Sequence, residues 1–146
     1  MEIINKLFTK KKKHTLEDDI GAYQVWLSLA MNSSGYRIMP YAEATLSSLS
    51  EIDRFLKEQS GDDGIIRKNG IDKILFALGC YVGEAIINDM HGIWITDDSD
   101  PCGRMNISVR LDDDSEIFPV KEIYNVFETE PEKGIRSRLA ELLIEY

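Results

Sequence analysis

Residues 77–95 read ALGCYVGEAIINDMHGIWI, and they predict the end of a long helix followed by a strand. The helix is expected from about Ile71 to Met90, and apolar residues cover most of its circumference, which is typical of a helix at the centre of a fold. Gly79 and Gly83 share one side of this helix, where the lack of side chains lets another element come close. Because each glycine costs about 1 kcal/mol of helix propensity relative to alanine, we expect the first or second helix, or the sheet, to pack closely against them.

Two helices are expected before the central one. Thr15 is placed to cap the first helix, with Asp18 three residues on, and the apolar pattern continues to about Met31. Pro40 is expected to begin the second helix, which ends near Glu58, before a loop rich in serine, glycine and aspartate.

Strands and two further helices are expected after the central helix. Gly92 is expected to cap that helix at its C-terminus. Residues 105–111 alternate strictly between apolar and polar side chains, which indicates a strand with one buried face. The patterns together predict an antiparallel meander over residues 93–96, 105–111 and 116–118, followed by helices over residues 120–128 and 135–145. The expected fold class is α+β: N-terminal helices, a long central helix, a three-stranded antiparallel meander and two C-terminal helices.

The length of the chain suits a single domain. The chain has 146 residues, of which 43% are hydrophobic, and the domain is expected over residues 15–146. Residues 1–14 include the run Lys10 to Lys13 and are expected to form a flexible basic tail. A weak membrane-surface anchor and an arm folded onto the acidic body are the alternatives for this segment.

Charge and cysteine content restrict the class of partner and the compartment. The formal charge of −9 and the sequence pI of about 4.7 favour basic partners and disfavour nucleic acid and anionic membranes, although many cytoplasmic proteins are acidic for solubility alone. No window approaches the ~20 apolar residues of a membrane span, and no secretory signal is seen. Cys80 and Cys102 do not make a disulfide framework, so both are expected to be reduced in a cytoplasmic protein.

No set of residues in the sequence predicts a catalytic or metal site. His14 and His91 are the only histidines, and no pair of histidines or cysteines has the spacing of zinc ligands, so no metal and no cofactor is expected. The Asp-rich turns at residues 97–100 and 112–114 should lie at opposite ends of a meander, where they cannot share one ion. Cys80 is about three helical turns, roughly 16 Å, from His91, which disfavours a nucleophile and base pair. The chain is therefore not expected to be an enzyme.

Glu84 has several possible roles on the polar stripe of the central helix. It could be solvated, or it could pair with Arg110 or Arg104 on the sheet. It could instead bind a ligand in a groove beside Gly79 and Gly83.

Trp94 points to the opposite face of its strand from Ile93 and Ile95. It is either a core residue covered by the C-terminal helices, or it is exposed beside Ser108 and Arg110. Exposed tryptophan and arginine dominate binding interfaces, so the second reading makes Trp94 an interface anchor.

The helix and strand resemble a family of small, uncharacterised bacterial domains with an LGxYxGE helix, a GxW strand and a closing PxxxxY helix. The pattern is matched by residues 78–84, 92–94 and 119–124, within a similarity that covers residues 71–127. Cys80 stands where the pattern more often has a small residue such as alanine. Such domains recur beside bacterial toxin genes, where small acidic cytoplasmic proteins act as antitoxins or immunity proteins. The resemblance implies that role and provides no catalytic residues.

The expected function is that of an acidic immunity protein that binds and neutralises a cognate basic toxin by occlusion. Tyr36 or Tyr41 could act as further anchors. The residues expected to contact the toxin are Trp94, Asp97, Asp98, Asp100, Arg110, Asp112, Asp113 and Asp114. The alternative is a regulatory domain that binds a small molecule or peptide in a groove at Gly79, Gly83 and Glu84.

Overall fold

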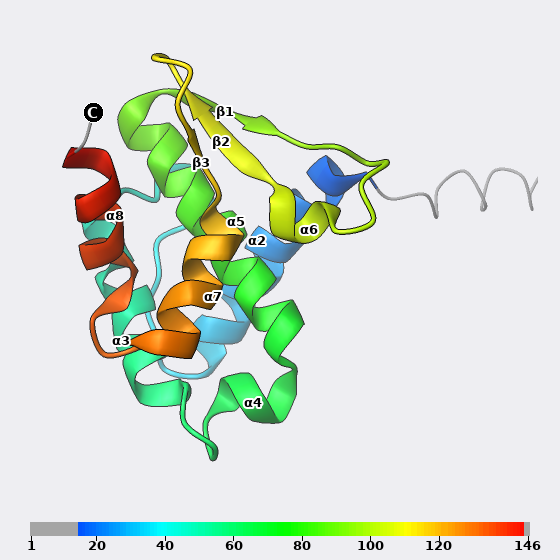
Figure 1. Cartoon of the computed structure of the whole chain (residues 1–146). Coiled ribbons are helices and arrows are strands. Elements are labelled where there is room, and N and C mark those ends of the chain that lie inside the picture. Colours follow the sequence, from blue (N-terminus) through cyan, green and yellow to red (C-terminus); the bar gives the residue numbers. More distant parts are fainter. Residues whose placement is uncertain (1–14, 145–146) are drawn as a thin grey trace, which may run out of the picture.

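The computed structural model of the chain describes residues 15–144, so the predicted basic tail, residues 1–14, lies outside the described part. The helices are α2 (Leu16–Ser33), α3 (Ser50–Gln59), α4 (Ile65–Asn69), α5 (Ile71–Met90), α6 (Gly103–Asn106), α7 (Pro119–Thr129) and α8 (Gly134–Ile144). The 3-10 helices η1 (Tyr41–Glu43) and η2 (Ser47–Leu49) precede α3, and the strands are β1 (Gly92–Ile95), β2 (Ser108–Leu111) and β3 (Glu116–Ile117). The predicted α+β fold, with a three-stranded antiparallel sheet, is confirmed (Figure 1).

Helix α5 is the centre of the fold, and its bounds are those predicted (Figure 1). Every residue from Ile74 to Gly83 is buried, so this stretch has no solvent-facing side. α2 and α7 both pack against α5, and β1 and β2 contact it as well. The Gln24 side chain joins α2 to α5, because its amide donates to the Cys80 carbonyl at 3.1 Å in a buried hydrogen bond.

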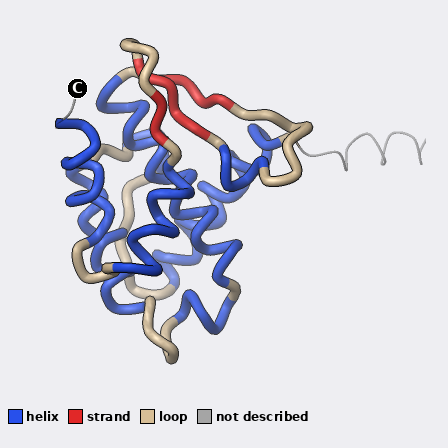
Figure 2. Tube along the Cα trace, viewed as in Figure 1, coloured by secondary structure: helices blue, strands red, loops and turns tan. Residues whose placement is uncertain are grey.

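The strands form a meander in the order β1-β2-β3, and both pairs are antiparallel. Figure 2 shows them gathered at one end of the helical body. The register places Trp94 opposite Val109 and Ile93 opposite Arg110. Because Val109 is buried and Arg110 is exposed, Trp94 lies on the face toward α5 and Ile93 lies on the outer face.

The prediction of one helix from Pro40 to Glu58 is wrong in its first half. The Thr45 N–H donates to Ser48 Oγ at 2.8 Å, and the Ser48 N–H donates to Thr45 Oγ1 at 3.2 Å. Such local hydrogen bonds satisfy backbone groups without a continuous helix and start a new turn. As a result η1 and η2 replace the first half, and the regular helix begins only at Ser50.

The strand predicted over residues 105–111 begins only at Ser108. The residues before it form the helical turn α6, in which the Asn106 N–H donates to the Cys102 carbonyl at 3.2 Å. The Asn106 side chain also donates to Asp100 at 2.8 Å. Hydrogen bonds to the preceding turn therefore stabilise helical backbone where alternation alone predicted a strand.

The C-terminal cap of α5 is His91, whereas Gly92 was predicted. His91 has a φ of 58°, and its N–H donates to the Ile87 carbonyl at 3.0 Å. Gly92 opens β1, where a Cβ atom would lie 2.9 Å from the Arg110 carbonyl oxygen. Close approach of two strands, rather than a helix cap, therefore explains the glycine.

The first helix and the last two follow the sequence pattern. The predicted capping box is present, because the Asp18 N–H donates to Thr15 Oγ1 at 3.1 Å and the Thr15 N–H donates to Asp18 at 3.3 Å. α7 and α8 occupy the positions of the two predicted C-terminal helices. The short helix α4 was not predicted.

Candidate functional site

Gly83, Glu84 and Trp94 form one contact between α5 and β1. The Trp94 indole lies against the bare backbone of Gly83, where a Cβ atom would overlap the ring. The indole Nε1–H donates to Glu84 Oε2 at 3.0 Å. The glycine makes room for the ring and the next residue accepts its hydrogen bond, so a half-buried tryptophan has its polar edge satisfied.

This contact supports the core interpretation of Trp94 over the exposed one, and it contradicts the arginine pairing suggested for Glu84. Trp94 is not an exposed anchor beside Arg110, because it is half-buried, faces α5 and lies on the opposite side of the sheet. Glu84 accepts the Trp94 hydrogen bond instead of pairing with an arginine of the sheet. Arg110 pairs with Glu116 at 2.9 Å and Arg104 reaches α2, so both arginines are engaged elsewhere.

The ligand groove predicted at Gly79, Gly83 and Glu84 is filled by protein. A Cβ atom on Gly79 would lie 2.6 Å from Val120 Cγ2 and 2.7 Å from Val120 Cα, so α7 packs directly on this glycine. The Trp94 ring fills the corresponding space at Gly83. Both glycines therefore serve close packing, as expected. The sheet is the partner at Gly83, whereas the partner at Gly79 is α7 and not the first or second helix.

The outer face of the sheet carries the exposed side chains of this region. Ile93 is 60% exposed, which is unusual for isoleucine in a strand. Its neighbour across the register is Arg110, whose guanidinium donates to Glu116 on β3 at 2.9 Å and 3.2 Å. The two contacts hold the arginine across the sheet, so its charge has a fixed position beside the isoleucine.

An open depression of about 610 Å³ adjoins these side chains, between the end of α5 and the β2–β3 turn. It is lined by Ile87 of α5, which is half-buried, and by residues 91–93, 110–112 and 114. We refer to five of them as the sheet-end surface: His91, Ile93, Arg110, Asp112 and Asp114. The structure thus brings three of the predicted contact residues together.

The other predicted acids take part in local hydrogen bonds. Asp113 accepts the Ser115 hydroxyl and the Ser115 N–H, which lower the pKa of its carboxyl. Asp98 accepts the Leu16 N–H at 2.8 Å and so binds the first turn of α2. The Asn106 amide, together with a backbone N–H, lowers the pKa of Asp100.

Asp97 also takes part in a local hydrogen bond, because it accepts the Ser99 N–H at 3.0 Å. Residues 97–100 precede β2 and residues 112–114 follow it, so the two acidic turns lie at opposite ends of the sheet. The two acidic turns therefore do not merge into one patch, and the sheet-end surface includes only the turn at residues 112–114.

His91 and Ile93 are the members of the sheet-end surface that the sequence did not indicate. The alternation in β2 places Arg110 on the outer face, and the residue opposite it must share that face. This signal identifies Ile93 only when the register is known. The register depends on the connection between β1 and β2, which contains the unpredicted turn α6.

Comparisons with known proteins do not assign the chain to a family. Searches against models of protein families, curated proteins and solved structures found no match. The resemblance to bacterial LGxYxGE domains therefore stays a prediction. Within residues 15–144, no helix is long and apolar enough to cross a membrane, and no three His, Cys, Asp or Glu side chains converge as a metal-binding group.

Cys80 and Cys102 are expected to differ sharply in reactivity. Cys80 is buried in α5, where burial raises the pKa of its thiol, whereas Cys102 is exposed in the β1–β2 connection. Iodoacetamide at neutral pH should modify Cys102 in the folded protein and modify both cysteines after denaturation, as measured by peptide mass spectrometry. Modification of Cys80 in the native state would contradict the observed packing of α2 on α5.

Proposed function

We propose that this chain is an acidic immunity-type protein that binds a basic protein toxin and blocks it by occlusion. The observation that carries the proposal is the sheet-end surface, where an exposed isoleucine and a positioned arginine lie beside an acidic turn. An exposed apolar residue within a charged rim is the arrangement of many protein interfaces.

The charge of the predicted domain, residues 15–146, favours a basic partner. The whole chain has 17 basic and 26 acidic residues, and residues 1–14 contain five lysines and one glutamate. Residues 15–146 therefore contain 12 basic and 25 acidic residues, a formal charge of −13. Such a body attracts a positive partner at long range and repels nucleic acid.

The proposed mechanism is competition for the toxin's own substrate groove. Asp112 and Asp114 project from the turn that borders the depression. Carboxylates that enter a basic groove take the place of an anionic substrate, while Ile93 excludes water from the centre of the contact. No bond is made or broken in this mechanism.

Removal of the turn charges is expected to slow association with the toxin. Asp112→Asn with Asp114→Asn removes two charges, and asparagine tolerates the positive φ of 67° at position 114. Association with the basic products of adjacent genes, measured by surface plasmon resonance, should slow about tenfold at low salt and less at high salt. The unmodified chain should bind one such product with a Kd of about 1 nM or tighter.

The matched control is Asp62→Asn with Asp63→Asn. These exposed acids lie in the α3–α4 loop, at the opposite end of the molecule from the β2–β3 turn (Figure 1). An equal decrease of the association rate in both double variants would mean that net charge acts without a specific surface. If none of the neighbouring gene products binds the chain, the proposed function is wrong.

A pocket of about 540 Å³ supports small-molecule binding as the second candidate function. Phe76 and Val120 contribute apolar surface, and the Tyr124 hydroxyl donates to Asp72 at 2.5 Å. Burial and the Asp72 hydrogen bond raise the pKa of Tyr124, so its phenol stays protonated. An apolar body with a few polar groups around it is typical of ligand pockets. Saturable thermal stabilisation by a metabolite would favour this function over toxin binding.

A further inference from the structure

The hydrogen-bond pattern of the sheet determines which backbone groups of β1 face outward. The Leu111 N–H donates to the Ser115 carbonyl at 2.9 Å, so Leu111 directs its backbone groups toward β3. Because these directions alternate in an antiparallel strand, Arg110 directs its N–H and C=O toward β1. Arg110 is opposite Ile93 in the register, so the backbone groups of Ile93 face β2.

The neighbours of Ile93 therefore direct their backbone groups away from the sheet. Gly92 and Trp94 place their N–H and C=O at the free edge of β1, which is an outer strand of the sheet (Figure 1). Among residues 15–144, no side chain or further strand forms a hydrogen bond with these groups. The edge of β1 is a row of unpaired donors and acceptors, which is the template for adding a strand.

The two edges of the sheet differ in how they are protected. Natural edge strands are made very short, charged, interrupted by proline or covered. β3 has two residues, includes Glu116 and runs directly into the helix that Pro119 begins. β1 has the sequence GIWI, without charge or proline, and it exposes Ile93. The unprotected edge is thus the one next to the sheet-end surface.

Acidic side chains lie at both ends of β1. Asp97 and Asp98 follow its C-terminal end and are exposed. Asp112 and Asp114 lie near the N-terminal end of β1, because they line the same depression as Gly92. A second copy of this chain would bring its own acids to these positions, so charge repulsion disfavours self-pairing. Lysine or arginine at both ends of an added strand would be favoured.

We propose that β1 accepts an extended segment of the basic partner as an added strand. The segment has uncharged, alternating residues in its centre and lysine or arginine at both ends. Main-chain hydrogen bonds to Gly92 and Trp94 supply the pairing, and the exposed Ile93 contacts side chains of the segment. This inference deepens the proposed function and rests on it for the class of partner, while the geometry rests on the sheet alone.

The test uses the full chain and a capped peptide, Lys-Lys-Thr-Val-Thr-Val-Thr-Val-Lys-Lys. Amide hydrogen exchange is followed residue by residue by NMR, with and without the peptide at about 1 mM. Exchange of the Trp94 amide should slow at least tenfold when the peptide binds. The Ile93 amide, which already bonds to β2, should change little. A peptide with proline in place of valine keeps the charge but cannot pair, and it should have no effect.

Ile93→Asp separates strand pairing from simple charge attraction. The substitution adds a negative charge, which would strengthen binding if attraction were the cause. It also places a poor strand former on the edge, so pairing predicts at least a tenfold loss of affinity. The control is Val25→Asp, at an exposed position of α2, which should leave affinity unchanged.

Three results would overturn the inference. The first is a peptide that does not bind, or one that binds while the Trp94 amide keeps its free exchange rate. The second is tighter binding by Ile93→Asp. The third is protection of the Trp94 amide in the chain alone, since the edge would then be occupied by residues 1–14 or a second copy. The proposed function fails separately, when no neighbouring basic protein binds at all.

Discussion

Gly83→Ala is expected to destabilise the protein by about 2 kcal/mol, although alanine is the better helix former. A Cβ atom at this position would overlap the Trp94 ring, which is rigid and is held by its hydrogen bond to Glu84. Forcing an extra carbon into a packed contact costs about 1–3 kcal/mol, and a displaced indole also loses a hydrogen bond of about 1 kcal/mol. The gain in helix propensity of about 1 kcal/mol offsets only part of this loss. Urea denaturation gives the free energy of unfolding of the variant.

Gly21→Ala is the matched control for that substitution. Gly21 is also a helical glycine, on α2, but a Cβ atom there would meet no atom within 4 Å. Alanine at position 21 should therefore stabilise the protein by up to about 1 kcal/mol. Adding Trp94→Leu to Gly83→Ala should cost less than the sum of the single changes, because the smaller side chain leaves room for the methyl group. Stabilisation by Gly83→Ala would mean that the ring does not press on α5.

The role of the two glycines in close packing was predictable from the sequence, but their partners were not. Their spacing and helix cost indicated that something approaches α5 closely, and the sheet was one of the expected elements. Which side chain fills each gap depends on the register of β1 and on the position of α7. Sequence patterns do not identify Trp94 and Val120 as the side chains that contact these glycines, because only the tertiary fold fixes their orientation.

The errors in the fold occur where polar side chains bond to nearby backbone. Apolar spacing predicted α5 from about Ile71 to Met90, as observed, because a buried helix leaves a long and regular signal. Thr45 with Ser48, and Asn106 with Asp100, redirect the chain over only a few residues. Hydrophobic periodicity contains no information about such bonds, so it extended a helix in one place and a strand in the other.

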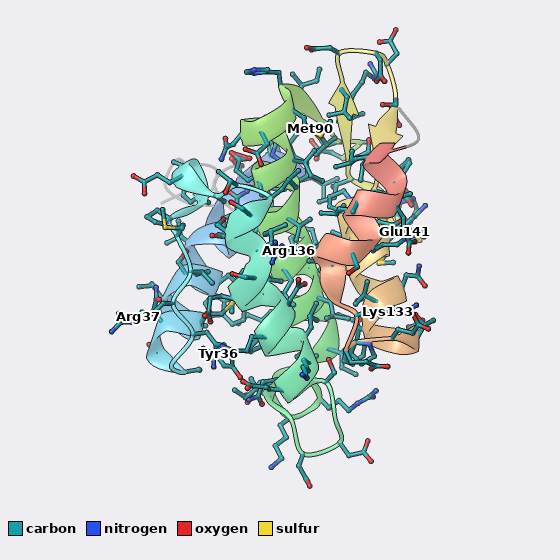
Figure 3. The ribbon with its side chains drawn as sticks, turned by 90° about the vertical axis from the view of Figure 1, so that its left-hand side faces the viewer. Tyr36, Arg37, Met90, Lys133, Arg136 and Glu141 are labelled. Atoms are coloured by element: carbon teal, nitrogen blue, oxygen red, sulfur yellow. The ribbon has the colours of Figure 1, made fainter. Side chains whose placement is uncertain are left out.

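Asp53→Ala is expected to lower the free energy of unfolding by about 2 kcal/mol, because it removes the side chain of α3 that caps α8. The Asp53 carboxylate accepts the Ile135 N–H at 2.7 Å and the Arg136 N–H at 3.4 Å. Gly134, at the start of α8, has a φ of 76° and lies against that carboxylate, so the helix has no side chain of its own there. Figure 3 shows α3 and α8 side by side, with Arg136 at their contact. Loss of a cap costs about 1–2 kcal/mol, whereas the fully exposed control Asp62→Ala should change the free energy of unfolding by less than about 0.5 kcal/mol.

Asp53→Asn should retain the cap and change how stability depends on pH. Burial raises the pKa of the Asp53 carboxyl, and its backbone hydrogen bonds reverse part of that shift. A raised pKa means that the folded chain binds the proton more tightly than the unfolded chain. The resulting stability is complete below the unfolded pKa, near pH 4, and is lost as pH rises through the folded pKa. The asparagine of the variant accepts the same N–H groups and does not titrate, so the unmodified protein should lose stability relative to Asp53→Asn between about pH 4 and pH 7. Urea midpoints of both proteins at the two pH values measure this difference, and a difference that is constant or of opposite sign would show that carboxylate burial does not control the titration.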